Sequence, residues 1–216
     1  MGPVVVENDN YKKIVTQISQ LKQGEGWTPT AAAIYLAADQ LENSNNFGGS
    51  NQNYKQIITL VTDGNANVYS EHDELCGSIW NNKILGQTAA NTARNYMLNT
   101  LSMTEDQDEF NVIAVDPGPN HEPIDKDWLC DDIVWPQPCF DGEPPPENDN
   151  GWPPPGPGWY NYSKNWTEFK IAIKNHFKIL FWKINNHAAV IETAYMDPHL
   201  SDNMATISIY PKNPEK

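Results

Sequence analysis

The chain has 216 residues, 39% of them hydrophobic, and a formal net charge of −14 at pH 7 from 28 acidic and 14 basic side chains. This length and apolar content suffice for one α/β domain with a core, or for one domain plus an appended piece, and they exclude a disordered chain. Phosphate binding needs clustered Lys and Arg, so the acidic composition disfavours nucleic acids and anionic membrane surfaces as partners. Divalent cations and cationic surfaces are the partners that this charge favours.

Membrane insertion is not expected for this chain. No segment approaches the roughly 18 consecutive apolar residues of a membrane span, and the first residues lack the pattern of a signal peptide. We therefore expect no direct membrane span, and we expect any export signal or anchor to lie outside the chain.

Helix and strand patterns alternate over the first 116 residues. Apolar spacing predicts helices over 11–21, 30–41 and around 84–101. A continuous apolar β-branched run predicts a buried strand over 57–61, a second buried strand is predicted over 110–115, and each strand ends at an Asp-containing turn. This alternation is typical of a doubly wound α/β fold, in which ligands bind at the carboxyl ends of the strands.

The second half of the chain is less regular. Residues 117–160 are rich in proline, and we interpret them as a surface insertion. An apolar face then predicts a helix over 166–185, and alternating residues predict two strands after it. We therefore expect a partial α/β domain over 1–187 and a β-rich tail over 188–216 that begins a further β domain or stalk.

The cysteines favour an oxidising compartment. Cys130 and Cys139 lie in one proline-rich loop that a disulfide would restrain, so we favour this pair. Pairing of Cys76 with either of them is equally compatible with the sequence. Glycosylation sequons at Asn161 and Asn165 agree with a secreted glycoprotein.

Two short motifs carry the candidate chemistry. Gly26-Trp27-Thr28-Pro29-Thr30 opens a predicted helix, and Leu60-Val61-Thr62-Asp63-Gly64 closes a predicted strand. Mg²⁺ prefers oxygen ligands, and loops at the strand ends of an α/β sheet can bring hydroxyl and carboxylate oxygens together. Both motifs also have a plain structural reading, because Asp-Gly forms turns and threonine caps helices.

These motifs resemble the second and third parts of the metal-ion-dependent adhesion site of the von Willebrand factor type A family. The resemblance implies that Thr28 and Asp63 are metal ligands and that Mg²⁺ is the cofactor, with Mn²⁺ or Ca²⁺ as alternatives. The family's first motif, D-x-S-x-S, is absent from the sequence. We therefore expect either a domain truncated at its N-terminus, which we favour, or a relative that has lost the metal.

The resemblance implies a cell-surface or extracellular adhesion module, not an enzyme, that engages a protein or glycan through a divalent cation. Asp197-Pro198-His199-Leu200 loosely resembles the segment that leads into the stalks of pilus-tip adhesins. One alternative is therefore a structural subunit of a pilus or surface filament that has a degenerate metal site and assembles with other surface subunits. A hydrolase that uses its acidic loops is another alternative.

The other candidate ligands have weaker patterns. Glu71-His72-Asp73-Glu74 could bind a cation, but a solvated acidic loop is the better interpretation. The remaining histidines, at positions 121, 176, 187 and 199, show no metal-ligand spacing, and we expect them to be ordinary surface residues.

Overall fold

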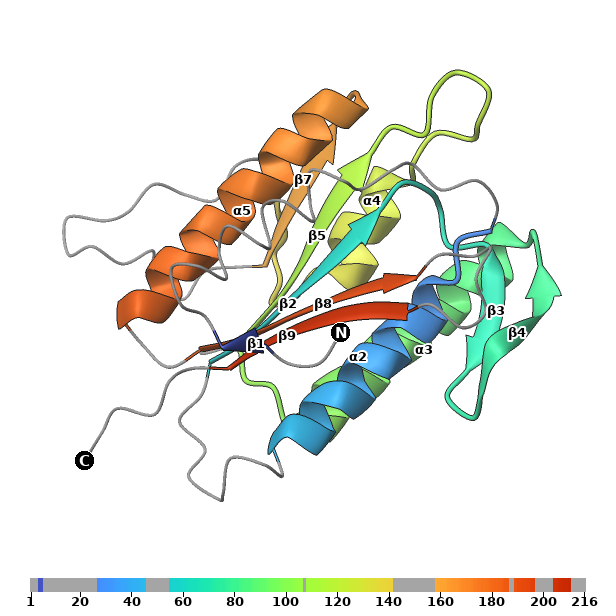
Figure 1. Ribbon diagram of the computed structural model, residues 1–216. Coiled ribbons are helices and arrows are strands. Elements are labelled where there is room, and N and C mark those ends of the chain that lie inside the picture. The colour runs from blue at the N-terminus through green and yellow to red at the C-terminus, as the bar shows by residue number, and fades with distance from the viewer. Residues whose placement is uncertain are drawn as a thin grey trace.

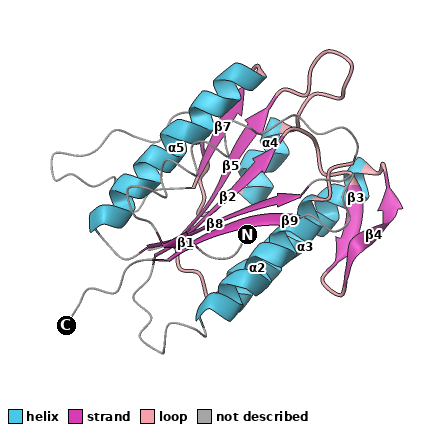
Figure 2. Ribbon diagram, in the orientation of Figure 1, coloured by secondary structure: helices cyan, strands magenta, loops and turns pink. Residues whose placement is uncertain are grey.

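A largely parallel β-sheet forms the centre of the protein, with helices on both of its faces (Figures 1 and 2). The computed structural model describes residues 4–5, 27–45, 55–106, 108–141, 158–186, 189–196 and 204–210. The helix predicted over 11–21 lies outside these residues.

The middle of the sheet consists of three parallel strands, β2 (Lys55–Thr62), β5 (Glu109–Val115) and β7 (Trp159–Ser163). All seven residues of β5 are buried, as expected for a strand that is covered on both faces. The predictions of buried strands over 57–61 and 110–115 are therefore confirmed.

Four further strands extend the sheet, which has the order β1-β9-β8-β2-β5-β7-β6 among the described residues. On one side, β6 (Phe140–Asp141) pairs in parallel with β7. On the other side, β8 (Ala189–Met196) pairs in parallel with β2, and β9 (Met204–Tyr210) pairs antiparallel with β8. The short strand β1 (Val4–Val5) lies at the outer edge beside β9.

The tail strands differ from the expectation of a further β domain that begins at residue 188. Both strands form, but Lys55 pairs with Ala189 and Ile58 with Glu192, so β8 is a neighbour of β2 in the main sheet. Residue alternation predicts that a segment is a strand, but it does not specify which strand it pairs with.

Two helices, α2 (Thr30–Asn45) and α3 (Lys83–Thr100), cover one face of the sheet, and α5 (Trp166–Asn186) covers the other (Figure 1). The α2–α3 face holds the main core, with alternate sheet residues such as Leu60 and Val112 packed beneath the alanines of both helices. The helices predicted over 30–41, around 84–101 and over 166–185 are therefore confirmed, and the fold class is mixed α/β. Within the described ranges, no helix combines the length and apolar character needed to cross a bilayer.

Residues 117–141 do not form the expected surface insertion. They include α4 (Lys126–Trp128) and a π-helix, η1 (Leu129–Ile133), and the side chains of Trp128, Leu129 and Ile133 are buried in the main core. The proline-rich composition of residues 117–160 predicted a surface segment, although these apolar residues belong to the core. The prolines of residues 142–157 lie outside the described part of the chain.

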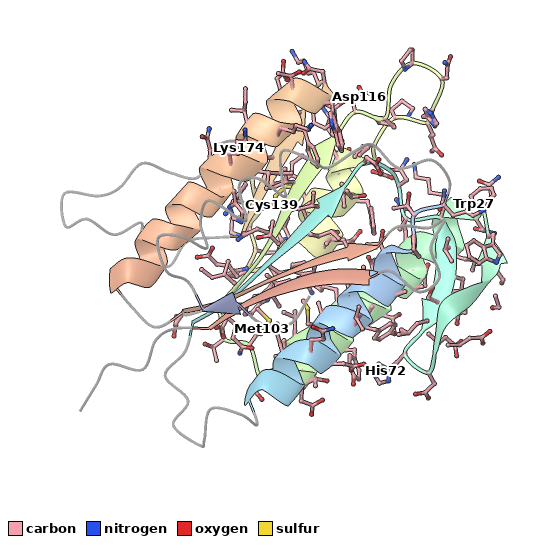
Figure 3. All side chains as sticks on the ribbon, in the orientation of Figure 1. Trp27, His72, Met103, Asp116, Cys139 and Lys174 are labelled. Carbon is pink, nitrogen blue, oxygen red and sulfur yellow. A yellow bond between two sulfur atoms is a disulfide. The ribbon has the colours of Figure 1, made fainter. Side chains whose placement is uncertain are left out.

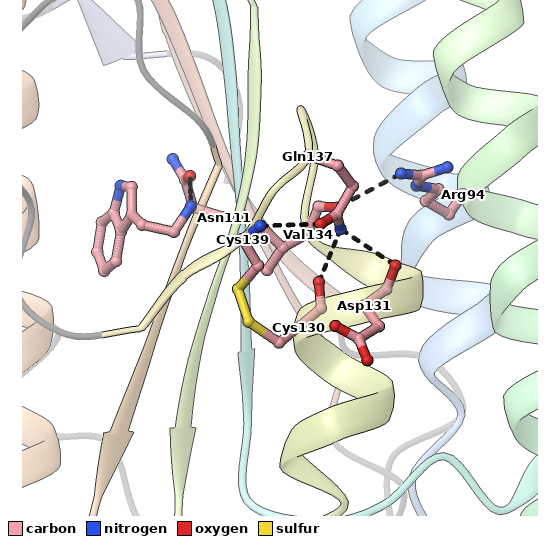
Figure 4. Close-up of a disulfide and its surroundings, with 8 residues drawn as sticks. Arg94, Asn111, Cys130, Asp131, Val134, Gln137 and Cys139 are labelled. Carbon is pink, nitrogen blue, oxygen red and sulfur yellow. Dashed lines mark hydrogen bonds between the residues drawn. A yellow bond between two sulfur atoms is a disulfide. The ribbon is translucent and has the colours of Figure 1, made fainter.

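The predicted disulfide between Cys130 and Cys139 is present, and it closes a loop that starts in η1. The Gln137 side-chain amide lies inside this loop (Figure 4). Its Nε2 donates to the carbonyl oxygens of Cys130, Asp131 and Val134, at 2.8, 3.1 and 2.9 Å. The bridge and this amide together hold the loop in one conformation.

A hairpin of β3 (Val68–Glu71) and β4 (Glu74–Trp80) was not expected from the sequence. The acidic segment around His72 forms its turn and is tied to α2, because His72 Nε2 lies 2.8 Å from Asp39 Oδ1. The hydrogen bond with Asp39 raises the pKa of His72 above its ordinary value. This segment is therefore a structural turn that is anchored on a helix.

Candidate functional site

Four loop segments meet beyond the carboxyl ends of β2 and β5 and enclose a pocket of about 190 Å³. One segment precedes α2, one follows β2, one precedes α3 and one follows β5. Strand ends of parallel sheets are common ligand sites because the loops converge there. The pocket is lined by Thr28, Asp63, Gly64, Asn65, Asn67, Asn81, Lys83, Pro117, His121 and Glu122.

Thr28 and Asp63, the two residues that the sequence singled out, line this same pocket. Gly64 permits the close approach of Thr28 to the turn that follows β2. A Cβ atom at Gly64 would lie 2.6 Å from Thr28 Oγ1, closer than two such atoms can come without a shift. The Asp-Gly pair after β2 therefore lets the threonine hydroxyl lie directly against the turn that carries Asp63.

Asn67 joins two walls of the pocket. Its side-chain oxygen accepts a hydrogen bond from the Thr28 backbone N–H at 2.7 Å, and its own N–H donates to the Thr28 carbonyl at 3.2 Å. Its carbonyl accepts from the Asn82 N–H at 2.9 Å, at the N-cap of α3. One asparagine thus fixes the segment before α2 relative to the segment before α3.

Asn65 fixes the loop after β5. Its side-chain Nδ2 donates to the Pro123 carbonyl at 2.8 Å, and its Oδ1 accepts from the Asp125 N–H at 2.7 Å. Because Asn65 is buried, its side-chain oxygen and its side-chain nitrogen both need hydrogen-bond partners. These bonds pin residues 123–125 next to the turn that carries Asp63.

Lys83 introduces a positive charge into the pocket. Its ammonium group lies 2.8 Å from Glu122 Oε1 and 3.2 Å from Asp125 Oδ2. The hydrogen bond to Glu122 is the main reason that the pKa of Lys83 is raised above its ordinary value. Burial raises the pKa of Asp125, but hydrogen bonds from Gln87, the Trp128 N–H and Lys83 outweigh it and lower that pKa overall.

The start of the loop after β5 is anchored to β7. Tyr162 donates its hydroxyl to Asp116 Oδ2 at 2.6 Å, and the Asp116 Oδ1 accepts from the Gly118 N–H at 2.8 Å. Burial, followed by the bond to Asp116, raises the pKa of Tyr162 to about 12. The loop therefore leaves the sheet in a fixed direction toward the pocket.

The pocket lining includes a threonine hydroxyl and an aspartate carboxylate, which are oxygen donors of the kind that Mg²⁺ prefers. The amide oxygens of Asn65 and Asn67 already accept backbone hydrogen bonds. Among the described residues, no group of three or more His, Cys, Asp or Glu side chains is placed to hold a metal ion. A cation here would therefore take few protein ligands and keep several waters, which is usual for Mg²⁺.

The remaining histidine predictions have mixed outcomes. His121 is exposed at the rim of the pocket. His176, expected at the surface, is only 2% exposed, and its Nε2 lies 2.6 Å from Thr59 Oγ1 between α5 and the sheet. His187 and His199 lie outside the described residues.

Sequence reasoning missed Asn65, Asn67 and Lys83 as residues of the site. Asn65 and Asn67 follow Asp63-Gly64 directly, so they read as ordinary turn formers. Their partners near residues 28, 82 and 125 are distant in the chain. Asn65 and Asn67 lie on either side of Ala66, directly after the turn that ends β2. This spacing is the one signal in the sequence that could have indicated these two residues.

No protein-family model matches the chain, and neither a curated protein nor a solved structure matches it. The function of the pocket is therefore inferred from its own residues and geometry.

Proposed function

We propose that the protein is an extracellular binding module of the von Willebrand A type, in which the pocket holds a divalent cation and the cation engages a partner. The observation that supports this most is the meeting of Thr28 and Asp63, far apart in the sequence, in one pocket at the strand ends. Gly64 fits closely against Thr28 Oγ1, which supports a binding role for Thr28 and Asp63 in addition to their roles before a helix and in a turn.

In this proposal Thr28 Oγ1 and the Asp63 carboxylate hold Mg²⁺ together with water molecules. When bound, the cation supplies an electrophilic position that an acidic side chain of the partner can complete. Asn67 and Gly64 hold Thr28 against the turn that carries Asp63, and Asn65 ties the loop after β5 to the same turn. Glu122, the other carboxylate of the pocket, is paired with Lys83.

A second candidate function is a structural subunit of a surface filament that binds its neighbours without a metal. Lys83 favours this alternative, because its ammonium group already provides a fixed positive charge inside the pocket. A relative that has lost metal binding would keep the same loops and the same fold. The two functions differ in whether Mg²⁺ binds and whether binding depends on Asp63.

Replacing Asp63 by asparagine tests the proposal while preserving the shape of the side chain. We expect Mg²⁺ affinity to fall by more than about tenfold, the smallest loss that is usual for changes beside a metal ligand. The measurement is isothermal titration of Mg²⁺ into the metal-free protein. Asp73→Asn is the matched control, since Asp73 is an exposed aspartate in the β3–β4 turn and does not line the pocket.

The control variant should bind Mg²⁺ as the unmodified protein does. Equal affinities for the unmodified protein and Asp63→Asn would show that the cation binds outside this pocket. No binding by any of the three proteins would favour the metal-free structural subunit.

A further inference from the structure

A second pocket, of about 230 Å³, lies between β7 and α5, on the face of the sheet opposite to α2 and α3. Successive side chains of a strand point to opposite faces of a sheet, so alternate residues of β7 face α5. Three of these, Trp159, Asn161 and Ser163, line the pocket. Glu168 and Asn175 line it from α5, and we refer to this pocket as the α5 groove.

The α5 groove is distinct from the strand-end pocket. Among the described residues, the two pockets have no lining residue in common. Figure 3 shows Lys174 on α5 well apart from Trp27, which directly precedes the pocket residue Thr28. The proposed cation therefore does not account for the α5 groove.

The wall of the α5 groove contains buried polar side chains. Ser163 and His176 are each 2% exposed, and both line the groove. His176 Nε2 lies 2.6 Å from Thr59 Oγ1 on β2, and Trp159 packs edge-on against the imidazole ring with 4.3 Å between the ring centroids. Burying polar groups costs free energy unless hydrogen bonds compensate, so this polar wall suits a ligand that itself forms hydrogen bonds.

Two asparagines give the α5 groove side chains that can both donate and accept hydrogen bonds. Asn161 Oδ1 accepts a long hydrogen bond of 3.4 Å from Ser163 Oγ, and within the described part of the chain its Nδ2 has no hydrogen-bond partner. Asn175 is exposed where the groove opens to solvent. Trp159 and Ile171 add apolar surface beside these amides.

We propose that the α5 groove binds one pyranose sugar ring. Sugar hydroxyls donate and accept hydrogen bonds as the asparagine amides do, and the C–H groups of the ring form an apolar face that can contact Trp159 and Ile171. The volume of the groove is below the range of about 300 to 1,000 Å³ that is usual for drug-sized ligands, so it suits a single ring. The inference does not rest on the proposed cation, and it applies to both functions proposed above.

The charges around the α5 groove favour a neutral ligand. No Lys or Arg among the described residues lines it, and the chain has a net charge of −14, so anions are disfavoured. Both carboxylate oxygens of Glu168 already accept hydrogen bonds, from the Lys164 N–H at 3.0 Å and from Asn165 Nδ2 at 2.8 Å. Because this carboxylate is engaged at the start of α5, the groove also disfavours a cationic amine.

Titration of sugars into the ¹⁵N-labelled full chain, followed by nuclear magnetic resonance, tests the proposal. The probes are glucose, galactose, mannose and N-acetylglucosamine, each as the free sugar and as its methyl glycoside. We expect at least one probe to shift the signals of the Trp159 indole and of the Asn161 and Asn175 side-chain amides until the shifts saturate. Binding of the methyl glycoside as well would identify the ligand as the terminal residue of a glycan, and binding of the free sugar alone would identify it as a monosaccharide.

Asn175→Leu should weaken the binding about three- to tenfold, which is the usual net value of one neutral hydrogen bond. Asn175 is exposed, so its replacement should not disturb the fold. Asn99→Leu is the matched control, because Asn99 is an exposed asparagine of α3 that does not line the groove, and it should leave the affinity unchanged. EDTA and Asp63→Asn should also leave it unchanged, so that a failure of the cation site would not affect this result.

Three outcomes would overturn the inference. The first is that no probe gives saturable shifts at the α5 groove. The second is that the unmodified protein, Asn175→Leu and Asn161→Leu all bind a sugar with equal affinity. The third is that EDTA or Asp63→Asn abolishes the binding, because the sugar would then be bound at the strand-end pocket.

Discussion

Replacing Trp128 by alanine is expected to lower the free energy of unfolding by about 3 to 5 kcal/mol, the usual cost of emptying a buried tryptophan site. Trp128 is 7% exposed, and its indole N–H donates to Asn91 Oδ1 on α3 at 2.9 Å. The substitution removes the packing of α4 on the main core and leaves the Asn91 oxygen without this donor. Urea denaturation followed by circular dichroism measures the loss.

Trp80→Ala is the control for this prediction. Trp80 is about half exposed at the end of β4, so its removal should cost about 1 kcal/mol or less. A loss at Trp128 no larger than the loss at Trp80 would mean that residues 117–141 do not belong to the core.

Removing the disulfide by replacing both Cys130 and Cys139 with serine is expected to lower the free energy of unfolding by about 2 to 3 kcal/mol. The two cysteines are 9 residues apart, and the bridge restricts the unfolded chain over that loop. In the folded state the bridge supports the contact of the loop with α3, where Arg94 donates to the Val134 carbonyl oxygen (Figure 4).

A reducing agent provides the control for the disulfide. Reduction should bring the unmodified protein to the stability of the double serine variant and leave that variant unchanged. Equal stability of the oxidised protein and the double variant would show that Gln137 and the packing of η1 hold the loop without the bridge.

The sequence was sufficient for the elements that form the central layers. β2 and β5 each contain a run rich in apolar and β-branched residues, and their burial follows from that composition. Helices α2, α3 and α5 show the apolar spacing that a covered sheet requires. Local pattern and tertiary environment agree in these segments, and therefore they could be predicted.

The sequence was insufficient where the structure depends on distant partners. The β3–β4 hairpin has an acidic turn and a left-handed glycine, Gly77, and no clear alternation. β8 was predicted as a strand, but only the structure pairs it with β2. The proline-rich composition around Trp128 suggested a surface segment, whereas a few apolar residues place it in the core.

The candidate site divides in the same way. Thr28 and Asp63 could be found because Thr28 lies in a recognisable motif before a predicted helix and Asp63 in a recognisable turn after a predicted strand. Asn65 and Asn67 could not, because the bonds that define their roles reach residues far along the chain. Lys83 belongs to the site only because α3 begins at the pocket, which depends on the packing of Gly86 against residues 66 and 67.

The most direct test of the central claim is to locate the cation with Mn²⁺ as a paramagnetic substitute for Mg²⁺ in nuclear magnetic resonance spectra of the ¹⁵N-labelled protein. Substoichiometric Mn²⁺ should broaden the backbone amide signals of Thr28, Asp63 and Gly64 first, and excess Mg²⁺ should restore them. The signals of the His72–Asp73 turn should remain sharp. Strongest broadening at that acidic turn, with the Thr28 and Gly64 signals unaffected, would contradict a cation site in this pocket.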